Sequence, residues 1–149
     1  MERDIKTLTK YLITKGIESP SKIQKVLFFL RVEELKSKNT KNSFFKQDNN
    51  FQAWIYGPVC VESFKFAQGY FDQFEEKEPF LLSDKDMKIL DEQYLKPLSK
   101  YINMSPKELI DKSHTNVAWI KARIGLSADE ICKNYLIEDE DFTHFEDGN

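Results

Sequence analysis

The sequence predicts a mainly α-helical protein, a single compact domain of six to seven helices, with room for a small two-stranded β element near residues 44–56. Apolar residues recur every three or four positions along most of the chain, which places them on one face of a helix. Five glycines and five prolines are too few for the many tight turns of β-sandwiches and barrels. Twenty aromatic residues among 149 supply the core of one folded domain.

The first two helices are predicted from capping residues and apolar stripes. Residues 3–15 carry apolar side chains on one helical face, and Gly16 is suited to end that helix. Ser19 is a good N-cap and Pro20 is tolerated at the first helical position, so a second helix should begin there. It should run to about Ser37, and its wide apolar stripe predicts burial on more than one side.

A short strand and a third helix are expected next. Residues 51–56 alternate weakly between apolar and polar, which is compatible with a short strand. Gly57-Pro58 should break that strand, and Pro58 should occupy the first turn of a helix that runs to about Phe74. Cys60 begins the apolar face of this predicted helix and should therefore be buried.

Three further helices are predicted from N-capping signals. Ser83 should open a long helix, in which Pro97 is expected to cause a kink or break because it lacks a backbone donor. A capping box begins a short helix over residues 105–113. A second capping box, at residues 127–130, should open a last helix that includes residues 131–136.

The charge of the chain is unevenly distributed. The net charge is −3, but residues 138–149 hold six acidic side chains and no Lys or Arg. The remainder, with 22 basic and 19 acidic side chains, therefore carries +3. We expect a helical domain over residues 1–137 and a flexible acidic tail over residues 138–149.

The location predicted from the sequence is the cytoplasm. No apolar run approaches the roughly 20 residues that span a bilayer, and the N-terminus lacks the apolar segment of a signal peptide. The two cysteines, Cys60 and Cys132, are far apart in a chain without a secretion signal and should be reduced. No membrane association is expected.

The residue patterns indicate no catalytic, cofactor-binding or metal site. Paired Cys or His ligands at zinc spacings and glycine-rich phosphate loops do not occur. A nucleophilic pair of Cys60 and His114 stays open as an alternative, since sequence spacing does not exclude it. Nucleic acid is not an expected partner because Arg, which base readout favours, occurs only three times. A small-molecule substrate is not expected either.

Two segments, residues 51–59 and 113–123, contain both tryptophans, Trp54 and Trp119, and one of the two histidines, His114. Tryptophan is large and amphipathic, and it is common both in cores and at interface hot spots. Two accounts therefore remain. Either these side chains pack the junctions between helices, or they form a surface that binds a partner.

Three motifs resemble those of a known family and occur in the family's order. Residues 23–29 (IQKVLFF) resemble its "KLQKLLYF" helix, and residues 53–59 (AWIYGPV) its "AWxYGPV" turn. Residues 108–119, with Ser113, His114 and Trp119, resemble its "ELxxxSHxxxxxW" element. The family is the Panacea domain family, also called SocA-like antitoxins and long described as phage-associated proteins.

The resemblance implies a mainly helical antitoxin, of prophage or mobile-element origin, that neutralises a co-encoded toxin by direct protein contact without catalysis. The alternative is a non-catalytic phage-associated interaction or scaffold protein without a toxin partner. The residues that carry the motifs are expected to be structural or partner-binding. They are Gln24, Lys25, Trp54, Tyr56, Gly57, Pro58, Val59, Ser113, His114 and Trp119.

Overall fold

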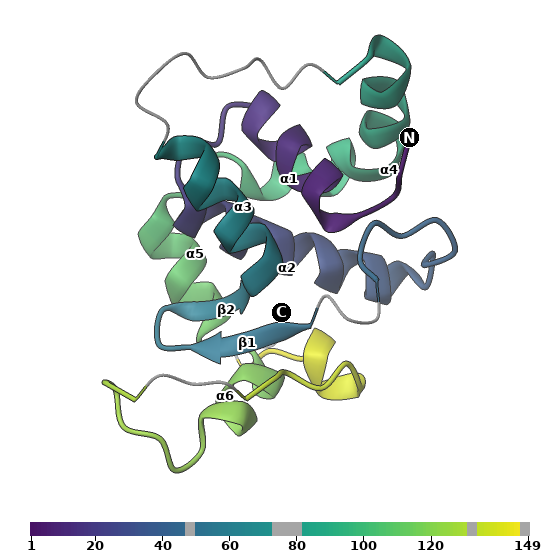
Figure 1. Cartoon of the computed structure of the whole chain (residues 1–149). Helices are drawn as coiled ribbons and strands as arrows, with labels where there is room; N and C mark the ends of the chain where they lie inside the picture. Colours follow the sequence, from purple (N-terminus) through teal and green to yellow (C-terminus); the bar gives the residue numbers. More distant parts are fainter. Residues whose placement is uncertain (47–49, 73–81, 131–133, 147–149) are drawn as a thin grey trace.

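The computed structural model describes residues 1–46, 50–72, 82–130 and 134–146. These residues form six α-helices, one antiparallel pair of strands and one 3₁₀ helix, so the predicted mainly α-helical class is confirmed (Figure 1). The elements are α1 (Ile5–Thr14), α2 (Pro20–Ser37), β1 (Phe51–Trp54), β2 (Gly57–Cys60), α3 (Val61–Phe71), α4 (Asp84–Tyr101), α5 (Pro106–Ser113), α6 (Val117–Arg123) and η1 (Glu140–Thr143). Within the described ranges no helix is long and apolar enough to cross a bilayer.

Helix α2 is the central element, and α1, α3, α4, α5, β2 and η1 all pack against it (Figure 1). Its two adjacent phenylalanines point into different parts of the core. The Phe28 ring meets Phe142 edge-on at 5.2 Å between centroids, whereas Phe29 stacks on Tyr101 at 4.8 Å. The predicted burial of this helix on more than one side is therefore confirmed.

Serine N-caps begin three helices at the predicted positions. The hydroxyls of Ser19, Ser83 and Ser105 each accept a hydrogen bond from a backbone N–H three residues later. At Ser105 the Glu108 carboxylate also accepts from the capping residue's own N–H, which completes the predicted capping box. These bonds satisfy donors that the first turn of a helix leaves unpaired.

Pro58 was expected in the first turn of the third helix, and that prediction is wrong. Pro58 lies in β2 opposite Ala53, and α3 begins only at Val61 with Cys60 as its N-cap. Opposed residues in an antiparallel pair alternate between hydrogen-bonded and non-hydrogen-bonded positions. Ala53 and Pro58 form a non-hydrogen-bonded pair, since the Ala53 N–H bonds outward to Asn134 O at 2.9 Å. A missing N–H therefore costs the sheet nothing here. Phe74, the predicted end of the helix, lies outside the described residues.

A kink or break was expected at Pro97, and the break does not occur: α4 runs as one helix from Asp84 to Tyr101. Proline removes only one intrahelical hydrogen bond. Buried side chains on both sides of it, including Tyr94 and Leu98, pack the two halves of α4 against the rest of the core. This packing offsets the local cost of the proline.

The helix predicted after residues 127–130 is absent from residues 134–136, while residues 131–133 lie outside the described part of the chain. Residues 134–136 instead run antiparallel to β1, with Leu136 N–H donating to Phe51 O at 2.8 Å. An uncovered strand edge presents unpaired backbone groups, and this segment pairs with them. Helix α6, which was not predicted, begins at Val117, and the side chain of its N-cap Asn116 accepts from Trp119 N.

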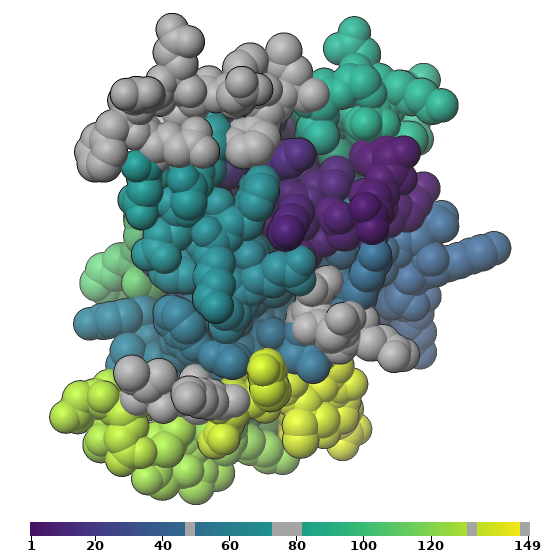
Figure 2. Space-filling model, viewed as in Figure 1, coloured from purple at the N-terminus to yellow at the C-terminus, as the bar shows by residue number. Residues whose placement is uncertain are grey.

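A flexible tail was expected over residues 138–149. In the structure, residues 138–146 pack against the rest of the protein instead. Phe142 and Phe145 are buried in the core, and η1 lies beside α6, as the yellow segment in Figures 1 and 2 shows. The Glu138 carboxylate accepts two hydrogen bonds from Arg31, at 2.8 and 2.7 Å. The free energy gained by burying two aromatic rings outweighs the preference of an acidic segment for solvent. Residues 147–149 lie outside the described part.

Replacing Phe142 by alanine should lower the free energy of unfolding by about 3–5 kcal/mol, because it leaves a cavity beside Phe28 and Phe51. Denaturant unfolding would measure this loss. Glu146→Ala, at an exposed position of the same segment, is the matched control and should change stability by less than about 0.5 kcal/mol. Equal effects of the two substitutions would show that the segment does not pack as described.

Candidate functional site

Residues from all three sequence motifs converge on the hairpin of β1 and β2, and most of them on its turn. Gln24 and Lys25 come from α2, Ser113 and His114 from the end of α5, and Trp119 from α6. Figure 1 shows the hairpin between α3, α5 and α6, with its turn toward α5. Three separate sequence motifs therefore build one structural unit, which we call the hairpin cradle: the turn at residues 54–57 and the side chains that contact it.

Three consecutive carbonyl groups of the hairpin accept hydrogen bonds from side chains outside it. The pairs are Arg123 Nη1 to Ala53 O (3.1 Å), Trp119 Nε1 to Trp54 O (2.8 Å) and His114 Nε2 to Ile55 O (2.9 Å). Backbone carbonyls in a turn would otherwise bond to water. Three directed donors hold the turn in one conformation. Sequence analysis did not identify Arg123 as a site residue. Its position one helical turn after Trp119 could have indicated it.

His114 is a neutral hydrogen-bond donor in this arrangement. Its ring stacks on Trp119 with centroids 4.4 Å apart and planes 13° apart. Burial lowers the pKa of His114, and the nearby positive charges of Lys25 and Arg123 act in the same direction. Because Ile55 O can only accept, the proton of the neutral imidazole must lie on Nε2.

Gly57 is required by the geometry of the cradle. Its φ is +114°, a conformation that residues with a side chain rarely adopt. A Cβ atom at this position would lie 2.5 Å from Ser113 Oγ and 2.9 Å from Lys25 Cε. The absence of a side chain thus lets the turn close directly over α2 and the end of α5.

Gln24 joins three elements through a buried polar chain. Its Oε1 accepts from Cys60 N at 2.9 Å, and its Nε2 donates to Ser63 Oγ at 3.0 Å. Ser63 Oγ in turn lies 2.7 Å from Thr9 Oγ1 on α1. Buried polar groups are costly unless they are paired, and every polar atom of this amide side chain has a partner of the right kind. The environment of Gln24 is that of a structural residue.

Lys25 differs from Gln24 because its ammonium group has no partner. Only 2% of this residue is exposed, yet among the described residues it donates no hydrogen bond and forms no ion pair. Burial lowers the pKa of Lys25 to about 8. At neutral pH it is therefore a buried positive charge that no carboxylate in the described ranges compensates.

The exposed residue of the cradle is Tyr56, at the tip of the turn. Tyr56 is 66% exposed, whereas Trp54 is partly buried and packs edge-on against Phe64 at 5.3 Å. Pro58 and Val59 are buried in β2. Of the motif residues, Tyr56 is thus the exposed one, whereas Trp54, His114 and Trp119 are half-buried.

A nucleophilic pair of Cys60 and His114 finds no support in this geometry. Burial raises the pKa of the Cys60 thiol to about 11, whereas a reactive cysteine needs a lowered pKa. His114 contacts Ile55 and Trp119 instead of the thiol. Cys132 lies outside the described residues. In the ranges that the structure describes, no three His, Cys, Asp or Glu side chains are grouped so as to hold a metal ion.

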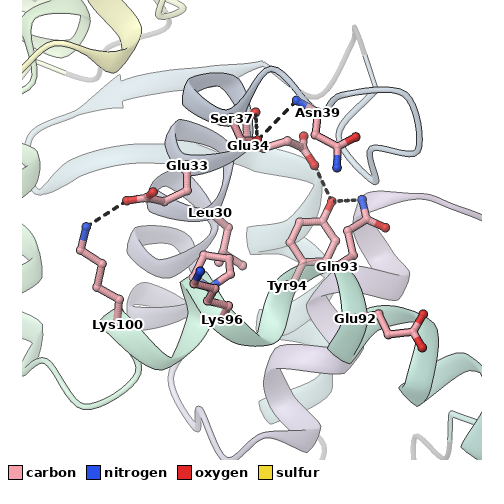
Figure 3. A pocket seen from close by; sticks show the side chains of 11 residues that line it. Leu30, Glu33, Glu34, Ser37, Asn39, Glu92, Gln93, Tyr94, Lys96 and Lys100 are labelled. Atoms are coloured by element: carbon pink, nitrogen blue, oxygen red, sulfur yellow. Dashed lines mark hydrogen bonds and ion pairs between the residues drawn. The ribbon is translucent and has the colours of Figure 1, made fainter.

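A groove of about 560 Å³ lies away from the cradle, between the C-terminal half of α2 and α4 (Figure 3). Its two α2 carboxylates already have protein partners. Glu34 accepts from Tyr94 Oη at 2.9 Å, and Glu33 accepts from Lys100 Nζ at 3.1 Å. These contacts join α2 to α4, so Glu33 and Glu34 have a structural role.

Fold and cradle together define a small helical protein that packs around α2 and holds a hairpin through side chains of the neighbouring helices. Residues 23–120 match the family model described as antitoxin SocA-like, Panacea domain. This span covers well over half of the chain and contains all ten motif residues, so the chain belongs to this family. No curated protein and no solved structure matches it.

Proposed function

We propose that this protein is an antitoxin that neutralises a co-encoded toxin by direct protein contact, and that the tip of the hairpin cradle touches the toxin. Membership of the SocA-like antitoxin family supports the class of function. The observation that carries the choice of surface is Tyr56, an aromatic side chain left 66% exposed on a turn whose backbone is held by three side-chain donors.

A rigid aromatic side chain is well suited to anchor an interface. Tyrosine supplies a large contact area together with a hydroxyl group, and it is enriched at binding hot spots. Binding costs less conformational entropy when the segment that carries the anchor is already ordered. The cradle meets this condition because its turn is bonded to α5 and α6 before any partner arrives.

The mechanism that we propose is occlusion of the toxin's active surface by the folded body, without catalysis. The acidic C-terminal segment is a weaker candidate for this task, because Glu138 is paired with Arg31 and Asp141 with Lys121. We further propose that the protein acts in the cytoplasm and derives from a prophage or another mobile element, as its family resemblance implies.

The adjacent reading frames provide the test. We expect one neighbouring product to be toxic when expressed alone and harmless when expressed with this protein. Tyr56→Ala should weaken binding of that product at least about tenfold, the effect of losing an interface hot spot. Tyr135→Ala removes a tyrosine that is 54% exposed elsewhere, and should leave binding unchanged.

Two outcomes would contradict the proposal in different ways. If no neighbouring product is toxic, the alternative of a phage-associated interaction or scaffold protein without a toxin replaces the antitoxin function. If a toxin is neutralised equally well by the Tyr56→Ala and Tyr135→Ala variants, the function stands, but the hairpin tip is not the contact surface. Isothermal titration of both variants with the purified toxin distinguishes these cases.

A further inference from the structure

Lys25 is a buried cation whose charge the described part of the protein leaves uncompensated. Its side chain passes beneath Gly57, where a Cβ atom would lie only 2.9 Å from Lys25 Cε and 3.2 Å from Cδ. The polar side chain next to this stem is Ser113, whose hydroxyl already donates to Ile110 O at 2.8 Å. Lys25 and Arg123 act on the neighbouring His114 as positive charges, and the carboxylate that also acts on this histidine, Asp111, is paired with Lys107.

This arrangement differs from that of other buried polar groups in the protein. Gln24, the preceding residue, has partners for both of its side-chain polar atoms. Arg31, one helical turn and a half further along α2, is paired with both Glu34 and Glu138. Charges are seldom buried unless they are paired, so an unpaired one in a well-satisfied interior indicates a missing counter-charge.

The ammonium group of Lys25 is also within reach from outside. Among the described residues, every fully enclosed side-chain nitrogen or oxygen has a hydrogen-bond partner. The Lys25 nitrogen has none, so it must touch solvent through a narrow opening. Because only 2% of the residue is accessible, a partner has to reach it with one small group, such as the end of a side chain or a chain terminus.

We propose that Lys25 binds a carboxylate group of the toxin, from an Asp or Glu side chain or from its C-terminus, which enters beside the tip of the hairpin cradle. This inference rests on the proposed function and assigns a charge partner to the same surface. Tyr56 anchors the toxin at the tip of the turn, and Lys25 pairs with its carboxylate at the solvent-accessible end of the lysine side chain. The toxin thereby supplies the counter-charge that the described part of the free protein does not provide.

The structure favours a carboxylate of a protein over a free organic acid. A carboxylate carried by the toxin is held in place by the rest of the interface, so its ordering cost is shared with the other contacts. A free acid at the same opening would have to offset its full loss of motion with one ion pair. Acetate therefore serves as the probe that tests whether a free organic acid binds at Lys25.

Binding of the neighbouring toxin to Lys25→Met and Lys36→Met variants tests the inference. Both substitutions remove one positive charge from α2, but Lys36 is exposed. Loss of a buried charge partner at an interface should weaken affinity by about 30-fold or more in Lys25→Met, while Lys36→Met should stay near the wild-type affinity. Methionine fills the space of the lysine stem, and circular dichroism would verify that the variant is folded.

Nuclear magnetic resonance of ¹³Cε-labelled lysine gives a second readout. The Lys25 signal, identified by its absence in Lys25→Met, should titrate near its depressed pKa in the free protein and above that value in the toxin complex. Acetate at millimolar concentration should not reproduce the change. A merely structural lysine would keep the same titration in both states.

The inference fails if wild type and Lys25→Met bind the toxin equally, if the Lys25 titration is unchanged in the complex, or if acetate alone reproduces the change without competing with the toxin. These outcomes leave the antitoxin function intact. If the wild-type protein binds no neighbouring toxin, the proposed function fails, and the pairing of Lys25 with a toxin carboxylate fails with it.

Discussion

Lys25→Met is expected to raise the free energy of unfolding of the free protein by about 3 kcal/mol at pH 7. Burial lowers the pKa of Lys25 from 10.5 to about 8, and a pKa difference of 1 between the folded and unfolded states corresponds to about 1.4 kcal/mol. Methionine occupies a similar volume without a charge to desolvate. Denaturant unfolding measures the gain, and Lys36→Met, at an exposed site of the same helix, should change stability by less than about 0.5 kcal/mol.

The same lysine makes stability depend on pH with a definite sign. Between pH 8 and 9, Lys25 loses its proton in the folded protein but keeps it in the unfolded chain. The unfolded chain then binds more protons, so stability rises with pH, by up to about 1.4 kcal/mol per pH unit. Above pH 9 the buried Cys60 thiol acts in the opposite direction, because its pKa is raised from 9.0 to about 11.

The pH window from 8 to 9 therefore reports mainly on Lys25. Lys25→Met should abolish the rise in stability there, while the exposed control Lys36→Met retains it. A loss of stability in Lys25→Met at pH 7 would show that the ammonium has a counter-charge in the free protein. The proposed role would then also lose its physical basis, since an already paired lysine needs no carboxylate from a partner.

Gly57→Ala should destabilise the protein by about 3 kcal/mol or more. Two costs add: a side chain at φ +114° is strained by about 1–2 kcal/mol or more, and its Cβ meets Ser113 Oγ at 2.5 Å. Thermal or denaturant unfolding would measure the sum. Disruption of the turn should also displace Tyr56 and thus weaken toxin binding.

Two other glycines separate these two costs. Gly16 has φ +101° with open space around its missing Cβ, so Gly16→Ala should show the backbone strain alone. Gly69 lies in α3 with open space and no positive φ, so Gly69→Ala should stabilise the protein by up to about 1 kcal/mol. A Gly57→Ala loss no larger than that of Gly16→Ala would mean that the cradle adapts to a side chain.

Helix starts were predictable from the sequence because their signals act over three or four residues. The hydroxyl of Ser105 needs only the N–H of Glu108, and both residues lie in the same short segment. The apolar stripe of α2 likewise predicted its burial on more than one side. Pro58 was misplaced because whether a proline suits a strand depends on the partner strand, here on the outward direction of the Ala53 N–H.

The composition of the candidate site was visible in three motifs, but its roles were not. Sequence spacing placed Trp54 and Trp119 in separate segments and left both packing and binding open. The structure shows the packing, since Trp119 donates to Trp54 O, and it leaves Tyr56 exposed as the residue for which we propose the binding role. Lys25 and Gln24 are neighbours in one motif, yet only their surroundings distinguish a paired amide from an unpaired ammonium.

The sequence by itself determined the helical class, the capped helix starts and the family, since these depend on residue types at short spacing. Only the tertiary structure decided whether the acidic segment packs against the body, and which residues of the cradle are paired, unpaired or exposed. Glu138 finds Arg31 at a distance of 107 residues along the chain, and Phe142 packs on Phe28. Such pairings follow from where folded elements meet in space, and local periodicity does not contain that information.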